Sequence, residues 1–284
     1  GLLFMRQCRN HRGAGHVVSS ARIAVSVLAV PVVTVVLAGT RHARAEQPLN
    51  IQQLMADSGS WQIVSAMDYR TLGGPGGVVQ RSAQVTAALR YGLSPRAEIN
   101  ARLHSGSGTD RRGEHGRNDN FGSAAMGVNW QLKPETRWPA LLLEATAHLY
   151  SRFASDSAAL PGAELSLTAY KSIDPVVLSL SARYRVRRAT KADGRRFDRS
   201  YSWQLAPQVN FAVNHRVTLM GGLVLDVSEA PRVGGVRWGS TRESLALRSG
   251  LGVRTGARST LFVTGDIVAD GGTSGVSLQW FQTL

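Results

Sequence analysis

The stretch His104-Ser105-Gly106-Ser107 brings together residue types that could perform nucleophilic chemistry. A general base must lie within about 3 Å of the hydroxyl it activates, and a third group must orient it. Neighbouring residues on a strand point to opposite faces, and we expect His104 and Ser107 to lie in a loop, so a polar loop explains these residues. Gly106-x-Gly108 lacks the remainder of a phosphate-binding loop, and the chain has no H-E-x-x-H spacing. We therefore predict a protein that is not an enzyme and holds no metal or other cofactor.

A second group of candidate residues is charged. These residues occupy alternate positions in stretches whose other positions are apolar. An arginine or lysine that faced lipid at the bilayer midplane would cost roughly 2–4 kcal/mol, so this phase predicts that the charges face the lumen of a barrel. One interpretation is a closed network of arginine–carboxylate pairs, and the other is a polar passage with a cationic, anion-preferring bias. The predicted lumen-facing residues are Asp68, Arg70, Arg90, Glu98, Arg102, Glu144, Arg183, Arg185, Asp226, Arg248 and Asp266, together with Asn100 and His148.

The elements that must position these residues are strands. Alternation with period two, as in Val85-x-Ala87-x-Leu89-x-Tyr91, recurs about every 20 residues. Most candidates are roughly as long as the 9–11 residues that a tilted strand needs to cross a bilayer. The predicted fold is all-β, a transmembrane antiparallel up-and-down β-barrel of about twelve strands. The candidate strands are 60–71, 81–93, 97–106, 120–133, 139–151, 163–173, 176–188, 200–213, 216–228, 243–255, 258–269 and 275–284.

Connection lengths favour the same architecture. Links after even-numbered strands are short, such as Asp174-Pro175 and Asn214-His215, whereas several after odd-numbered strands are long and polar, such as Gly106–Asp119 and Ala189–Arg199. Short periplasmic turns and long external loops are typical of outer-membrane barrels. One residue conflicts with the pattern, because Pro207 removes a ladder hydrogen bond inside the eighth candidate strand, and it requires either a bulge or a local change in the strand count.

The ends of the chain carry further signals. Thr273-x-Gly275-x-x-Leu278-x-Trp280 matches the pattern with which outer-membrane barrels end, and we interpret it as a barrel-assembly signal read by the assembly machinery. Residues 1–45 contain six arginines and no acid, an apolar run over 23–39, and Ala43-Arg44-Ala45. This organisation predicts a signal peptide, with a membrane anchor as the alternative. The predicted parts are 1–45 as signal peptide, 46–59 as a periplasmic or plug segment, and 60–284 as the barrel.

Removing residues 1–45 lowers the net charge from +14 to +8 and removes Cys8, the only cysteine. The remaining charge includes Arg111-Arg112, Arg187-Arg188 and Arg195-Arg196, at or in long external loops. These pairs could contact anionic lipopolysaccharide, or they could be ordinary solvated loop charge. Interleaved aromatic residues for stacking bases are absent, so we expect no nucleic-acid partner.

Leu49–Asp57 places Leu49, Ile51, Leu54 and Met55 at near-helical spacing ahead of the first strand. This segment could fold into the barrel as a plug, or it could be a periplasmic tail. If it is a plug, deletion of residues 46–58 should raise the conductance.

Several stretches resemble a known family: Leu49-Asn-Ile-Gln-Gln-Leu54 with Gly59-Ser-Trp61, Leu89–Pro95, Asp174–Leu180 and Asn214–Gly222. They are similar to outer-membrane transporters grouped with the MetA-pathway phenol-degradation proteins, and more distantly to the barrel domain of the bacterial functional-amyloid exporter. The resemblance covers most of residues 46–284 and implies a twelve-stranded barrel with a role in transport or secretion. It carries over no functional residue.

Together these observations predict an outer-membrane channel or transporter that passes or exports a solute or polymer and contacts outer-membrane lipid. The alternative is a non-conducting structural or adhesive barrel whose long external loops bind a partner.

Overall fold

A computed structural model describes residues 49–52, 54–73, 79–112, 115–153, 162–187, 190–192, 195–230, 232–237, 240–269 and 273–284. The predicted signal peptide, residues 1–45, lies outside the described residues. Among those that are described, no helix is long and apolar enough to cross a membrane.

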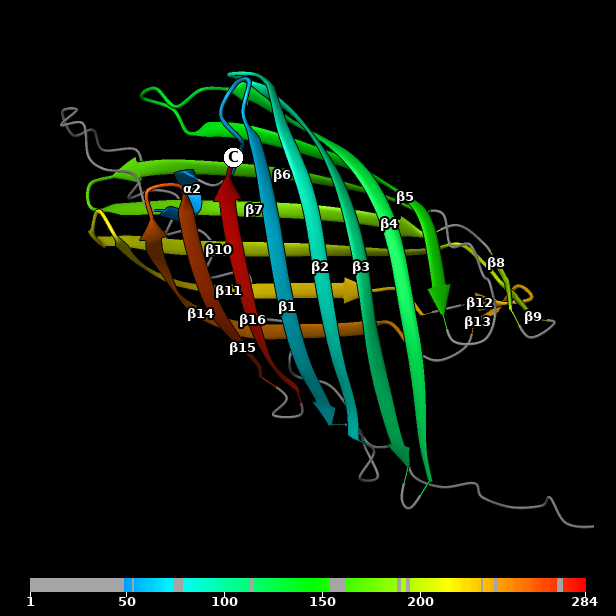
Figure 1. The fold of residues 1–284 in the computed structure, drawn as a ribbon. Helices are drawn as coiled ribbons and strands as arrows, with labels where there is room; N and C mark the ends of the chain where they lie inside the picture. Colours follow the sequence, from blue (N-terminus) through cyan, green and yellow to red (C-terminus); the bar gives the residue numbers. More distant parts are fainter. Residues whose placement is uncertain are drawn as a thin grey trace, which may run out of the picture. The chain divides into compact units, whose positions relative to one another are not determined.

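Twelve antiparallel strands form one closed barrel, as the sequence predicts (Figure 1). Each strand pairs with its neighbours in the barrel order, and β1 pairs with β16 over Gln62–Leu72 and Thr273–Thr283 to close it. The barrel strands are β1 Trp61–Gly73, β2 Val79–Ser94, β3 Ala97–Arg112, β4 His115–Lys133, β5 Ala140–Phe153, β6 Gly162–Ile173, β7 Val176–Arg187, β10 Ser200–Asn214, β11 Val217–Ser228, β14 Arg242–Gly256, β15 Ser259–Val268 and β16 Thr273–Thr283.

The alternation in the sequence becomes two faces of the wall. Large apolar side chains such as Met67, Leu103 and Leu247 are more than half exposed on the outside, although they are the residues that a soluble protein would bury. The intervening positions, among them Arg90, Glu98 and Asn210, are buried inside. An apolar exterior around a polar interior is the pattern of a barrel surrounded by lipid.

The two ends of the barrel differ, as the connection lengths predict. Four two-residue turns, among them Pro95–Arg96 and Asp174–Pro175, and the six-residue link 134–139 lie at one end, together with the C-terminal residue Leu284 (Figure 1). We call this the short-turn end, and we call the opposite end the loop end.

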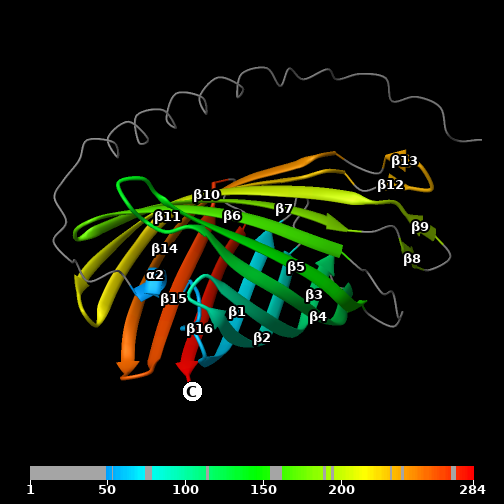
Figure 2. The same ribbon diagram turned by 90° about the horizontal axis from the view of Figure 1, so that it is seen from above.

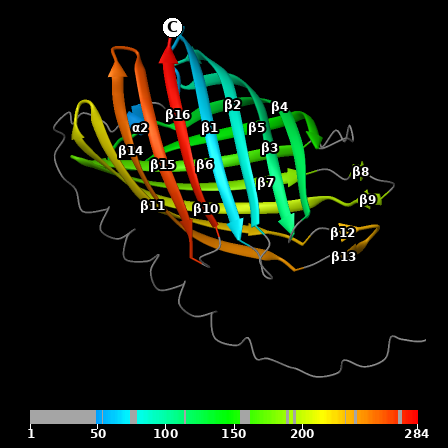
Figure 3. The same cartoon turned by 60° about the horizontal axis from the view of Figure 1, so that its bottom comes forward.

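Two predictions about the loop end are wrong. The expected loop Gly106–Asp119 is largely strand, because β3 and β4 stay paired as far as Arg112 and His115. Strands that continue beyond a membrane still pair through their backbones, but their residues need not alternate between apolar and polar. The polar sequence of this hairpin therefore gives no sign that β3 and β4 continue. The second wrong prediction is that Ala189–Arg199 is only a loop, because it contains two strands of a separate four-stranded sheet at the loop end (Figure 3). The strands of this sheet are β8 Thr190–Ala192, β9 Arg195–Phe197, β12 Arg232–Val233 and β13 Val236–Arg237.

Pro207 needs neither a bulge nor a different strand count. The β10–β11 ladder lacks the two pairs between Leu205↔Leu225 and Gln208↔Gly222, yet the register is the same on both sides of the gap. A side chain at Gly222 would lie 2.5 Å from the carbonyl oxygen of Pro207, so glycine permits the close approach of the two strands here. The register shift in this hairpin lies instead between Ala212 and Asn214, beside the turn.

Candidate functional site

The segment before β1 crosses the lumen near the short-turn end. It begins with α2, Leu49–Gln52, which contacts β11 and β14 (Figure 2). Leu49 is only 2% exposed, packs in one cluster with Met220 and Phe262, and donates its backbone N–H to Thr218 Oγ1 at 3.0 Å. Phe281 of β16 packs against the same cluster, so Leu49 is anchored to the β11–β16 part of the wall.

The next anchors lie on other parts of the wall. Ile51 is buried in a cluster with Ala140, Leu142, Tyr170 and Val177, which belong to β5, β6 and β7. Leu54 and Met55 pack against this cluster, and the chain then reaches β2 and β3. These contacts lie on three separate parts of the barrel wall, so the segment runs across the lumen from one side to another. We call residues 49–58 the crossing segment.

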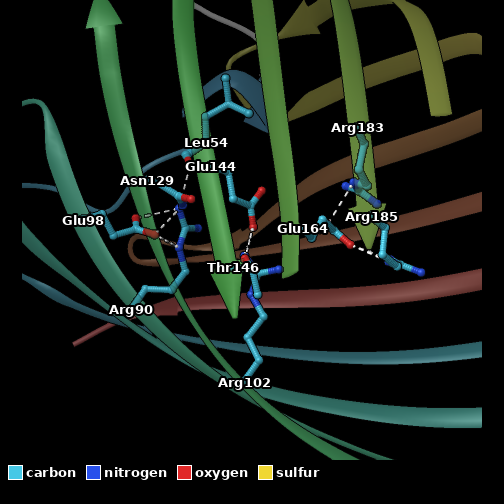
Figure 4. Close-up of polar contacts among 10 residues, drawn as sticks. All are labelled: Leu54, Arg90, Glu98, Arg102, Asn129, Glu144, Thr146, Glu164, Arg183 and Arg185. Carbon is cyan, nitrogen blue, oxygen red and sulfur yellow. Dashed lines mark hydrogen bonds and ion pairs between the residues drawn. The ribbon is translucent and has the colours of Figure 1, made fainter. Parts of the chain in front are cut away.

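An ion pair of β2 and β3 holds the last part of the crossing segment (Figure 4). Arg90 donates to both carboxylate oxygens of Glu98 at 2.8 and 2.7 Å, and Nη2 also donates to the Leu54 carbonyl at 2.7 Å. Glu98 accepts the backbone N–H of Ala56 at 2.5 Å. We call Arg90 and Glu98 the latch.

The latch is buried and supported from both sides. Glu98 is 0% exposed and Arg90 is 8% exposed. Gln62 of β1 accepts from Arg90 Nη1 at 2.7 Å, and Asn129 of β4 donates to Glu98 at 2.8 Å. A buried ion pair must have its hydrogen-bonding capacity met to offset desolvation, and here the barrel wall and the crossing segment meet it together.

Gly92 makes room for the crossing segment next to the latch. Ser58 forms a parallel bridge with Gly92, Gly59 donates its N–H to the Gly92 carbonyl at 2.8 Å, and Gly92 donates to the Ser60 carbonyl at 3.1 Å. A Cβ on Gly92 would overlap the backbone carbonyl of Asp57 and lie 2.9 Å from that of Ala56. The absence of a side chain therefore allows the backbone of the crossing segment to lie against β2.

Other predicted lumen residues form separate ion pairs, and Figure 4 shows the pair of Arg102 and Glu144. Arg102 donates to Glu144, which also accepts from Thr146 at 3.4 Å. Arg248 makes a two-bond contact with Asp266, at 2.7 and 2.8 Å. In these places the structure resembles the closed network of the first interpretation.

Glu164 is a lumen residue that the sequence-based list omits. It receives Nε and Nη2 of Arg185 at 2.8 and 2.6 Å, and Arg183 Nε lies 3.1 Å from its other oxygen. Its signal was present, since Glu164, Ser166 and Thr168 alternate with Leu165 and Leu167. With Glu164 added, the predicted charges become six arginines and six carboxylates, so the cationic bias of that set disappears.

Asp68, Arg70 and Asp226 are arranged differently. No ion pair joins any of them to another of the described residues, and Asp226 accepts only from Ser228 Oγ, at 3.1 Å. All three line a polar cavity of about 370 Å³ together with Arg183 and Arg185. The structure thus brings five of the eleven predicted residues into one cavity and distributes the other six among three ion pairs.

The histidine and serine considered first do not form a catalytic pair. Both belong to β3 and not to the predicted loop, with His104 in the inward phase and Ser107 exposed on the other face. His104 Nδ1 instead lies 2.8 Å from Thr86 Oγ1 and 3.2 Å from Gln84 Nε2. Asn100 is buried inside, and neither its amide nor His148 Nε2 has a hydrogen-bond partner in the described part of the chain. Nowhere in the same part do three His, Cys, Asp or Glu side chains gather as metal ligands would.

The predicted assembly signal lies on the strand that closes the barrel. Thr273, Gly275, Leu278 and Trp280 pair with Leu72, Arg70, Met67 and Ser65 of β1. Leu278 and Trp280 point outward. Recognition of this strand by the assembly machinery remains a prediction.

Comparisons with known proteins identify the fold. No family model matches the sequence, and no curated protein matches it. Solved structures do match: an outer-membrane channel from Pseudomonas putida F1 shares 12% identity with a TM-score of 0.65, over 87% of this chain and 100% of that one. The β domain of the Bordetella autotransporter BrkA shares 10% identity with a TM-score of 0.57, over 80% and 100%. The porin NanC shares 12% identity with a TM-score of 0.50, over 78% and 100%. The fold is therefore that of outer-membrane β-barrels, among them channels, translocator domains and porins.

Proposed function

We propose that this protein is an outer-membrane channel that passes or exports a solute or polymer, with residues 49–58 as a plug at its short-turn end. One observation carries the proposal: an apolar outer face encloses a polar lumen, and a segment held to the wall at several points crosses that lumen. In the proposed orientation the short-turn end faces the periplasm and the loop end faces outward, since outer-membrane barrels typically have short periplasmic turns and longer external loops.

The arrangement of the plug explains how such a channel could be narrowed without being filled. The lumen retains a cavity of about 370 Å³, and a second cavity of about 620 Å³ lies beside Ile51, Leu54 and Met55 at the short-turn end. A segment attached by a few hydrogen bonds and apolar contacts can leave its seat more readily than a paired strand can leave the wall.

The test is planar-bilayer conductance of the refolded chain 46–284, compared with the same chain lacking residues 46–58. We expect stable single-channel steps from both, with larger steps after the deletion. Equal steps would refute the plug and leave the channel standing. No steps from either protein, with the barrel shown to be folded by its heat-dependent mobility in gels, would refute the channel.

A second candidate is a non-conducting structural or adhesive barrel that binds a partner through its loop end. The extra sheet β8-β9-β12-β13 favours it, because two different loops are joined there by the Asp198 N–H to Arg232 carbonyl bond of 2.8 Å. Exposed Arg199, Arg232 and Arg237 on these loops would suit anionic lipopolysaccharide. A folded barrel that never conducts but binds lipopolysaccharide would select this candidate.

A further inference from the structure

The polar cavity of the lumen joins opposite walls. Asp68 and Arg70 come from β1, Arg183 and Arg185 from β7, and Asp226 from β11. In the closed order of twelve strands, β1 and β7 are six strands apart and therefore face each other. A single cavity of about 370 Å³ with lining residues on both strands spans the lumen, so we expect a solute in the passage to contact it.

The β7 wall of this cavity has unused hydrogen-bond donors. Arg183 and Arg185 share one carboxylate within ion-pair distance, that of Glu164. Arg185 directs Nε and Nη2 to Glu164. The terminal nitrogens of Arg183 and Nη1 of Arg185 make no hydrogen bond to another described residue, and Arg183 is 42% exposed along its side chain.

The remaining lining is suited to hydroxyl groups. Asp68 and Asp226 form no ion pair with another described residue, so their oxygens can accept hydrogen bonds. Ser82, Ser202 and Gln204 add neutral donors and acceptors. Two acidic groups disfavour a multiply charged anion, whereas a guanidinium fork matches a single carboxylate.

We propose that this cavity binds a small hydroxylated carboxylate, with the carboxylate on Arg183 and Arg185 and hydroxyl groups on Asp68 and Asp226. The inference rests on the proposed channel function and names the class of solute that the passage retains. Recognition depends on these free donors, since the three arginines of the cavity are matched in charge by Asp68, Asp226 and Glu164.

The experiment uses gluconate as the probe and the refolded chain 46–284. Isothermal titration calorimetry in detergent measures binding whether or not the barrel conducts, and gluconate-induced block of single-channel current measures the same event in a bilayer. We expect gluconate to bind and block, and glucose, which has hydroxyl groups and no carboxylate, to do so at least about tenfold more weakly, because hydrogen bonds to charged groups are lost.

The variants separate the site from the overall charge. Arg183→Gln with Arg185→Gln should weaken gluconate binding at least about tenfold. Arg102→Gln is the matched control, since Arg102 belongs to a lumen ion pair whose residues do not line the cavity, and it should leave binding within about twofold. If the double variant does not fold, Arg183→Lys replaces it: lysine keeps the charge but loses the free pair of terminal guanidinium nitrogens, so an intermediate affinity is expected.

Each outcome has one meaning. Gluconate binding with the expected order of variants supports the proposal. Single-channel steps without gluconate binding or block overturn it and leave the channel intact. Equal effects of the double variant and of Arg102→Gln overturn the assignment to this cavity. A folded barrel that binds gluconate without conducting would refute the channel and keep the site.

Discussion

Gly92→Ala should displace the crossing segment without damaging the barrel. The backbone at Gly92 lies outside the left-handed region, so alanine can adopt it. The added methyl group would meet only backbone atoms of Ala56 and Asp57, which no side-chain rotation can move aside. The crossing segment must therefore shift away from β2.

The size of the effect follows from the bonds beside the overlap. The Ala56 N–H to Glu98 bond of 2.5 Å has a charged acceptor, and such bonds contribute about 1.5–3 kcal/mol. One of the two backbone bonds between Gly92 and residues 59–60 adds about 1 kcal/mol. A loss of roughly 2–4 kcal/mol raises the ratio of displaced to bound crossing segment by roughly 30- to 700-fold, at about 1.4 kcal/mol per tenfold.

A unique cysteine reports the displacement directly. The chain 46–284 has no cysteine of its own, and Ala56 is only 6% exposed, so Ala56→Cys should react slowly with a maleimide while the segment is seated. Adding Gly92→Ala should accelerate labelling and increase single-channel conductance. Gly221→Ala is the matched control, because its Cβ would meet nothing within 4 Å. Unchanged labelling and conductance in Gly92→Ala would refute the argument that the segment is held by close fit at this glycine.

Three further variants test other contacts. Glu98→Gln should lower the midpoint of thermal unfolding, since removing one partner of a buried pair typically costs about 3–5 kcal/mol, and a midpoint equal to wild type would contradict the latch. Glu164→Gln should raise the permeability of chloride relative to potassium, measured as a reversal potential in a salt gradient, because Arg183 and Arg185 lose their shared counter-charge; an unchanged potential would place them outside the ion path. Leu49→Ala should raise conductance, because a buried leucine truncated to alanine loses about 2–5 kcal/mol, and wild-type steps would show that α2 does not obstruct the path.

The barrel could be predicted because the membrane imposes a simple rule on every strand. Outward positions such as Leu103 and Leu247 must be apolar along a length set by the bilayer, so alternation and strand length are both visible in the sequence. The rule ends where the membrane ends. Asp110 still pairs with Arg117 in the extended β3–β4 hairpin, but neither residue carries a signal that distinguishes strand from loop.

The sequence predicts which residues face the lumen, but it predicts only some of the contacts among them. Within the hairpin of β2 and β3, Gly92 pairs with Glu98 and Arg90 with Asn100, so Arg90 and Glu98 are diagonal neighbours. This register depends on an irregularity between Gly92 and Ser94, because a two-residue turn alone would place Arg90 opposite Ala101. The attachment of Leu54 and Ala56 to this pair does not follow, because it depends on where a segment outside the alternating pattern folds. The pairing of Glu164 with Arg183 and Arg185 was accessible to the same hairpin argument.

The lumen contains two kinds of arginine, and their difference suggests how structure and passage are kept separate. Arg90 donates hydrogen bonds to Glu98, Gln62 and the Leu54 carbonyl, and it is almost fully buried. Arg183 shares a carboxylate with its neighbour and keeps exposed donors toward a cavity. A guanidinium whose bonds are used can fix a segment but has little left for a solute, whereas one with free donors can bind a solute but stabilises the wall less. The first kind lies at the crossing segment and the second at the polar cavity, so a mutation at Arg90 should act on the seating of the plug and one at Arg183 on the choice of solute.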